Sequence, residues 1–204
     1  MNKIFLETGK KETSEYVFVK TLLNTLSIPS DSYQIECVGG KDNLSKVTQQ
    51  LKSNSLDGGK NLILFDADFP SNNGGFSNRF QDISQQLRQY GIISDIFLFP
   101  NNKDDGDFET LLEKIIPREK CNDDFWDCYT QYENCLKTKG FHIPPRKGKL
   151  YAYIETMFSI HNLSLRKGIS SGQWHFEKTE YWDMQSNELS PLKDFLQKWL
   201  PLNQ

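Results

Sequence analysis

The chain has 204 residues, of which 37% are hydrophobic and 25% are charged, a composition typical of one globular domain and not of a disordered protein. Its net charge of −3 argues against a protein that coats nucleic acid through overall positive charge, although it does not exclude a local basic groove. No apolar run is long enough to span a bilayer, and the N-terminus does not resemble a signal peptide. We therefore expect a cytoplasmic protein without membrane contact.

The first half of the chain predicts strands and helices in alternation. Short apolar or alternating runs that end at turn residues predict strands at 3–6, 33–38, 61–65 and 92–99. Capping residues and helical spacing predict a helix with Ser14 as its cap, helices that begin at Asp42 or Asn43 and at about Asn78, and a helix after Asp107 as N-cap. Repeated strand–helix units favour an α/β fold with a mainly parallel sheet flanked by helices.

From Arg118 onward the pattern changes to helices rich in aromatic residues. Helical spacing predicts helices at 120–139, 149–161 and 191–199, whereas residues 162–189 show little periodicity. We therefore divide the chain into an α/β core at 1–116 and a helical C-terminal elaboration at 117–204 that packs on this core.

Two aspartates, Asp66 and Asp68, directly follow the most apolar predicted strand. In open parallel sheets, ligands bind beyond the carboxyl ends of the strands. Two aspartates separated by one residue can both approach one cation there, as hard oxygen ligands for Mg²⁺. The alternative is a local structural role, in which these side chains bond to backbone N–H groups and shape the turn.

Further acidic residues follow two other predicted strands. Glu7 comes at the end of the first strand, which is commonly central in such sheets, so its carboxylate and those of Asp66 and Asp68 could form one metal-binding cluster. Asp107 is well explained as an N-cap, with Glu109 in the first helical turn. Glu109 is explained in the same way only if that helix end faces solvent and not the Asp66 loop.

The order of these motifs resembles a TOPRIM domain. The stretches VGGKDNL (38–44), LILFDAD (62–68) and GDFETLLE (106–113) carry most of the match. More narrowly, the chain resembles small stand-alone TOPRIM-like proteins of an uncharacterised bacterial family, distantly similar to the overcoming-lysogenization-defect nucleases. This resemblance implies a parallel sheet that holds a glutamate and a D-x-D pair around Mg²⁺ (or Mn²⁺) for phosphodiester chemistry on nucleic acid.

Carried onto this sequence, the resemblance makes Glu7 the catalytic base or a metal-facing acid, and Asp66 and Asp68 metal ligands. Asp107 and Glu109 resemble the additional acidic motif of the nuclease branch, where a second metal binds. The turn after Glu7 departs from the family pattern, since an extra residue precedes Gly9 and the turn is longer, which leaves a role for Glu12 open.

Basic residues cluster around the Pro-rich segment at 144–149. Lys147 and Lys149 are candidates for catalytic residues, because a lysine near the metal site would stabilise negative charge in the transition state. The alternative is a solvated loop with ordinary helix-terminal charges.

Two functions remain open from the sequence. The first is a Mg²⁺-dependent nucleic-acid phosphodiester hydrolase or phosphotransferase. The second is a non-catalytic TOPRIM-like binding or regulatory module that acts with a partner protein, for example in phage defence. A nucleotide-binding protein is less well supported, because no phosphate-cradling G-x-x-x-x-G-K-[ST] loop is present.

Overall fold

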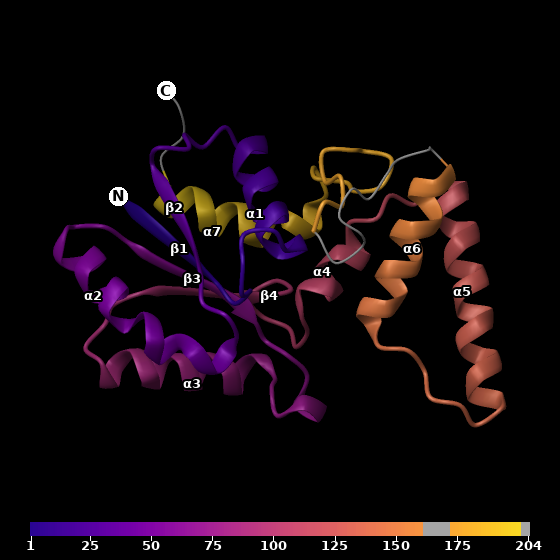
Figure 1. Ribbon diagram of the computed structural model, residues 1–204, viewed down its shortest axis with the longest axis horizontal. Helices are drawn as coiled ribbons and strands as arrows, with labels where there is room; N and C mark the ends of the chain where they lie inside the picture. The colour runs from indigo at the N-terminus through magenta and orange to yellow at the C-terminus, as the bar shows by residue number, and fades with distance from the viewer. Residues whose placement is uncertain (161–171, 201–204) are drawn as a thin grey trace.

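Four parallel strands form the centre of the protein in the computed structural model, which describes residues 1–160 and 172–200 (Figure 1). The sheet order is β2-β1-β3-β4. The strands are β1 (Asn2–Leu6), β2 (Tyr33–Cys37), β3 (Asn61–Asp66) and β4 (Asp95–Phe99). The predicted α/β fold with a parallel sheet flanked by helices is confirmed.

The central position of β1 brings two acidic strand ends together. Leu6, the last residue of β1, pairs with Cys37 of β2 on one side and with Leu64 of β3 on the other. Because all the strands are parallel, Glu7 and Asp66 therefore leave the sheet side by side at the same edge.

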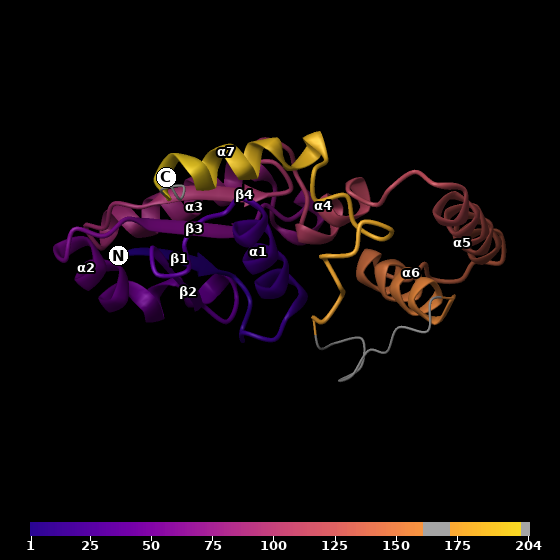
Figure 2. The same ribbon diagram turned by 90° about the horizontal axis from the view of Figure 1, so that it is seen from above.

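Helices cover both faces of the sheet. On one face α2 (Thr48–Leu56) and α3 (Phe76–Gln89) bury Leu51, Ile83 and Leu87 against Phe5 and Ile63. On the other face lie α1 (Ser14–Thr25) and α7 (Ser190–Trp199), as Figures 1 and 2 show. The C-terminal helix thus returns to the strands formed by the first half of the chain.

Three more helices carry the chain from the end of β4 to the second half. They are α4 (Phe108–Lys114), α5 (Lys120–Thr138) and α6 (Arg146–Ile160), and short 3-10 helices lie at Lys41–Val47, Pro70–Asn72 and Asn187–Leu189. The helices α5 and α6 lie beside each other and away from the sheet (Figure 1). None of the helices in the described residues combines the length and apolar character of a membrane span.

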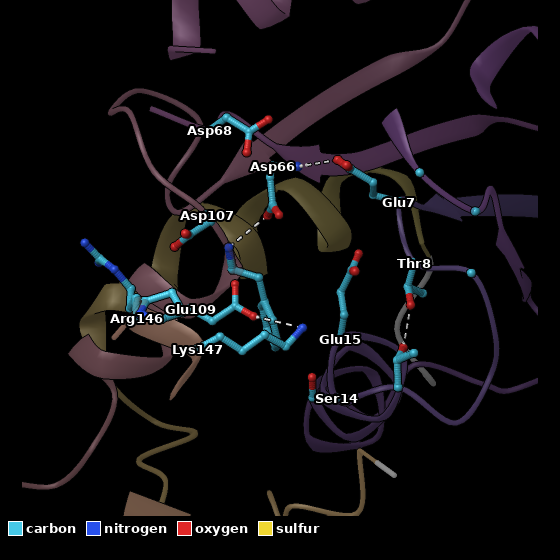
Figure 3. Close-up of a pocket in the computed structure, with 16 residues that line it drawn as sticks. Glu7, Thr8, Ser14, Glu15, Asp66, Asp68, Asp107, Glu109, Arg146 and Lys147 are labelled. Carbon is cyan, nitrogen blue, oxygen red and sulfur yellow. Dashed lines mark hydrogen bonds and ion pairs between the residues drawn. The ribbon is translucent and has the colours of Figure 1, made fainter. Parts of the chain in front are cut away.

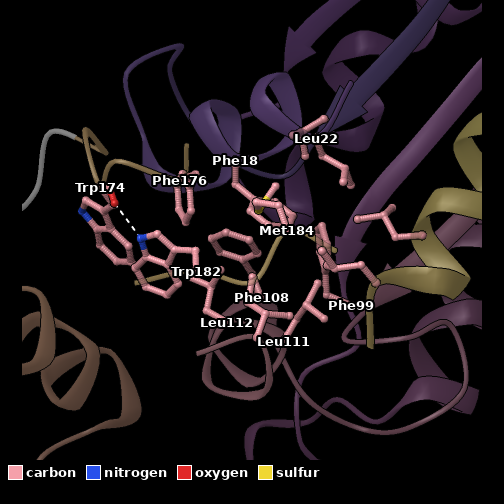
Figure 4. Close-up of a cluster of buried hydrophobic side chains, with 14 of the residues drawn as sticks. Phe18, Leu22, Phe99, Phe108, Leu111, Leu112, Trp174, Phe176, Trp182 and Met184 are labelled. Carbon is pink, nitrogen blue, oxygen red and sulfur yellow. Dashed lines mark hydrogen bonds between the residues drawn. The ribbon is translucent and has the colours of Figure 1, made fainter. Parts of the chain in front are cut away.

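An aromatic cluster connects α1 and α4 with the segment that begins at residue 172. Phe18 lies 5.1 Å from Phe108 and 5.3 Å from Phe176 between ring centroids. The indole N–H of Trp182 donates to the Trp174 carbonyl at 2.7 Å, which satisfies a polar group inside this cluster (Figure 4). The N-terminal end of α1 and α4 are therefore held close together.

Several element boundaries differ from the prediction for local reasons. Thr13, not Ser14, caps α1, since its Oγ1 accepts from the Tyr16 N–H. The helix expected at Asp42 or Asn43 is a 3-10 helix, and α2 begins only at Thr48.

The boundaries of β4 and α6 also differ from the prediction. β4 begins at Asp95, where pairing with β3 starts, and Ile93 before it is 85% exposed. The helix predicted at 149–161 begins at Arg146, and His161 lies outside the described residues.

Candidate functional site

A polar pocket of about 580 Å³ lies at the carboxyl edge of the sheet (Figure 3). Six carboxylates from the ends of two strands and the first turns of two helices line it, together with two cationic side chains. The carboxylates are Glu7, Glu15, Asp66, Asp68, Asp107 and Glu109, and the cations are Arg146 and Lys147. All five residues predicted as metal ligands therefore line one pocket.

Glu7 and Asp66 are linked through the backbone. The Asp66 N–H donates to Glu7 Oε2 at 3.1 Å, which turns the Glu7 carboxylate towards β3. Burial raises the pKa of Glu7, and the nearby Asp68 raises it further, whereas the Asp66 N–H and the charge of Arg79 oppose the shift. A carboxylate with a raised pKa is a stronger proton acceptor than an exposed one.

The N-terminus of α4 faces Asp66. The Phe108 N–H donates to Asp66 Oδ1 at 2.8 Å, so the helix end points at the strand end and not at solvent. Burial raises the pKa of Asp66 well above its usual range, and the charges of Glu15, Glu7, Glu109 and Asp107 add to the shift. This orientation also brings Glu109 into the pocket, where Lys147 Nζ lies 3.5 Å from its Oε1.

Asp107 fills the capping role considered in the sequence analysis. Its Oδ1 accepts from the backbone N–H of Thr110 at 2.8 Å and from the Thr110 hydroxyl at 2.6 Å. Together with the backbone N–H of Asp107, which donates back to the Thr110 hydroxyl, these bonds form a capping box. Asp107 lines the pocket, but its Oδ1 is already engaged in the hydrogen bonds that cap α4.

Asp68 is held by the loop that follows β3. Its φ of 59° lies in the left-handed region, and its carbonyl accepts from the Gly106 N–H at 3.0 Å. Gly74 packs so closely on Asp68 that an added Cβ would lie 2.3 Å from the Asp68 Cβ atom, so only glycine fits there. Lys41 Nζ lies 3.4 Å from Asp68 Oδ2.

Glu15 belongs to the pocket although the sequence analysis did not identify it. It extends from the first turn of α1 towards Asp66 (Figure 3), and its Oε1 is buried without a hydrogen-bond partner among the residues that the structure describes. Burial raises the pKa of Glu15 to about 8, and the charges of Glu7 and Glu109 contribute to this shift. Glu12, which the sequence analysis left open, is not among the lining residues.

The two lysines proposed as catalytic have different surroundings. Lys147 lines the pocket beside Glu109. Lys149 does not line it, since its Nζ lies 3.9 Å from Glu113 and 4.5 Å from the centre of the Trp126 ring. Arg146 lines the pocket instead and donates from Nη1 to the Thr110 hydroxyl at 2.8 Å.

The donor set suits a hard divalent cation. Carboxylate oxygens are the ligands that Mg²⁺ prefers, and a cation would relieve the mutual repulsion that, after burial, raises the pKa values of Glu15 and Asp66. Glu15 Oε1, which has no hydrogen-bond partner in the described part of the chain, is a ligand atom of this kind. Within residues 1–160 and 172–200, however, no three His, Cys, Asp or Glu side chains are already spaced to hold a metal ion. The residues fit Mg²⁺ by chemistry and charge without forming a complete coordination shell.

Comparison with known proteins adds a family but no activity. No curated protein and no solved structure matches the chain. Residues 12–201, nearly the whole chain, match a family whose description is "Protein of unknown function (DUF3226)". The chain therefore belongs to the DUF3226 family.

Proposed function

We propose that this protein is a Mg²⁺-dependent (or Mn²⁺-dependent) TOPRIM-type enzyme that hydrolyses or transfers phosphodiesters of nucleic acid in the cytoplasm. The observation that carries the proposal is the pocket at the carboxyl edge of β1 and β3, where six carboxylates meet Lys147 and Arg146. The TOPRIM resemblance supports it, because the matching motifs supply four of the acids that line the pocket, with Glu7 at the strand end as a fifth.

The proposed roles follow from the contacts of each residue. Asp66, Asp68 and Glu7 would hold the metal, with Glu109 assisting and Glu15 as an additional oxygen donor. A bound Mg²⁺ would neutralise phosphate charge and lower the pKa of a bound water. Lys147 and Arg146 would bind the phosphate at the opposite wall of the pocket. In the alternative role, Glu7 would face the metal without binding it and would accept the proton of the attacking water, since its pKa is raised.

Two residues of the sequence prediction take smaller roles in this proposal. Asp107 orients α4 through its cap and faces the pocket only with the remainder of its carboxylate. Lys149 is left out, because its contacts with Glu113 and Trp126 hold it outside the lining.

A non-catalytic module that binds a partner protein is the second candidate. The observation that favours it is a cation beside three of the six acids, since Lys41 contacts Asp68, Lys147 contacts Glu109, and Arg79 lies near Glu7. Such pairing lowers the need for a metal ion in the pocket. A TOPRIM-shaped scaffold without turnover would show this arrangement.

One experiment separates the two candidates. Mg²⁺ and Mn²⁺ binding is measured by calorimetry for the native chain and for Asp66→Asn/Asp68→Asn, and the same proteins are incubated with single- and double-stranded DNA and RNA. We expect binding and cleavage in the native chain and the loss of both in the variant. Asp82→Asn, an exposed site on α3, is the matched control and should behave as the native chain. Cleavage that survives in the double variant, or a native chain that binds no metal and cuts no substrate, would contradict the enzymatic proposal.

A further inference from the structure

Arg79 is a buried cation directly behind the acidic pocket. It is the fourth residue of α3, and only 6% of its surface is exposed. Its Nε and Nη2 atoms are buried, and neither has a hydrogen-bond partner in the part of the chain that the structure describes. A guanidinium stays charged at all ordinary pH values, so burying it requires compensation by nearby negative charge.

Two pocket carboxylates supply that compensation. Arg79 Nη2 lies 3.9 Å from Glu7 Oε2, and Nε lies 4.0 Å from Asp68 Oδ2. These separations are too long for hydrogen bonds, so the interaction depends on charge and not on the fork-shaped geometry of the guanidinium. Arg79 does not line the pocket, which leaves it no contact with a molecule bound there.

We propose that Arg79 is an internal counter-ion and positioning residue, which holds Glu7 and Asp68 side by side at the pocket wall from the protein interior. The two acids come from β1 and from the loop after β3, and each bears on the other as a like charge. Arg79 offsets that repulsion when the pocket holds no cation. Its link to catalysis rests on the proposed function, whereas its action as a counter-ion does not.

The counter-ion role of Arg79 predicts how strongly Mg²⁺ stabilises the protein. A cation in the pocket and Arg79 in the interior attract the same two carboxylates. Without Arg79, the charges of these acids would be offset only by Lys41, which contacts Asp68, and by the pocket cation. Ligands that bind only the folded state stabilise it, so Mg²⁺ should stabilise a chain without Arg79 more than the native chain.

The test is a double-mutant cycle in EDTA, followed by thermal unfolding. Arg79→Met removes the charge, and we expect the melting temperature to fall by on the order of 10 °C. In the Glu7→Gln/Asp68→Asn background the same change should cost less than half as much, because the partner charges are gone. Arg79→Lys should retain most of the native stability, since it keeps the charge. Arg88→Met, at an exposed site on the same helix, is the control and should change little.

The unfolding data distinguish a charge role of Arg79 from a packing role. An equal loss in both backgrounds, or an Arg79→Lys chain as unstable as Arg79→Met, would show that Arg79 acts by packing and would overturn the proposal. If Arg79→Met does not fold, recovery of folding in Arg79→Met/Glu7→Gln/Asp68→Asn supports the proposal, and no recovery, while Glu7→Gln/Asp68→Asn itself folds, overturns it.

A repeat in MgCl₂ separates this inference from the proposed enzyme. A larger Mg²⁺-induced rise in melting temperature for Arg79→Met than for the native chain supports the counter-ion role of Arg79 and also the metal-dependent function. Charge coupling in EDTA with no Mg²⁺ effect on any chain would leave the counter-ion in place and remove the metal-dependent function. A smaller Mg²⁺ effect in Arg79→Met than in the native chain would overturn the idea that the two cations share these carboxylates.

Discussion

The carboxyl group of Glu15 links the electrostatics of the pocket to the stability of the protein. Burial raises its pKa from an ordinary value of 4.5 to about 8, so the folded protein holds this proton more tightly than the unfolded chain does. The resulting stabilisation is complete below about pH 4.5 and is lost as the pH rises through about 8, with a slope of up to ~1.4 kcal/mol per pH unit. Asp66, whose pKa is also raised, contributes in the same direction.

Glu15→Gln should therefore flatten the fall in stability between pH 5 and pH 8. Glutamine has the shape of the protonated acid and cannot ionise, so at pH 8 the variant should be more stable than the native chain. Urea unfolding in EDTA at several pH values measures this, with Glu155→Gln at an exposed position of α6 as control. A variant with the same pH dependence as the native chain would show that Glu15 is not the group responsible.

Two residues of the site were missed for identifiable reasons. Arg79 occupies the same helical stripe as Ile83 and Leu87, since each is four positions from the next, and this spacing marks it as facing the core. Glu15 gave no such signal, because its position depends on how α1 packs after β1. The opposite orientations of Lys147 and Lys149 follow from helix geometry, since residues two apart lie on opposite sides of a helix.

At the scale of elements, the acids that follow the strands were predictable, whereas the position of α6 beside the pocket was not. Apolar runs marked the strands, and the parallel sheet brought Glu7 next to Asp66. Whether Glu109 is only a charge in the first turn of a solvent-facing helix or a residue of the pocket depended on the direction in which the end of α4 faces. The hydrogen bond from the Phe108 N–H to Asp66 shows that this end faces Asp66. No periodicity in the sequence indicates that α6 begins at the pocket, because that placement depends on long-range packing with α4, including the Arg146–Thr110 hydrogen bond.

The cap of α4 gives a prediction about Asp107. Asn is as good an N-cap as Asp, so Asp107→Asn should retain the stability of the native chain in EDTA, whereas Asp107→Ala should lose about 1 kcal/mol. Because the proposed function gives Asp107 the role of a cap and not of a metal ligand, we expect both variants to retain Mg²⁺ binding, unlike Asp66→Asn/Asp68→Asn. Urea unfolding and calorimetry measure the two properties. Loss of Mg²⁺ binding in Asp107→Asn with unchanged stability would instead make Asp107 a metal ligand.

At the scale of the whole molecule, the two ends of the chain build one core. α7 packs on the strands of the first half, where Phe195 lies 5.4 Å from Phe97 between ring centroids. The Asn2 side chain donates to the Trp199 carbonyl at 2.7 Å, which joins the first strand to the last helix. The boundary drawn at residue 116 therefore divides the sequence but not the hydrophobic core, which runs from Ile4 to Leu200.

Removal of α7 should consequently unfold the sheet and the pocket together. Leu192, Leu196 and Leu200 are buried, and each contributes about 1.5–3 kcal/mol to folding, against a total stability of about 5–15 kcal/mol for a domain. We expect the chain 1–189 to lose cooperative thermal unfolding and to bind a hydrophobic dye, whereas the control chain 1–200, which retains α7, should unfold as the full chain does. A cooperative transition in 1–189 at the native temperature would show instead that the sheet is stable with one face open, and that α7 is an addition to an α/β core that folds without it.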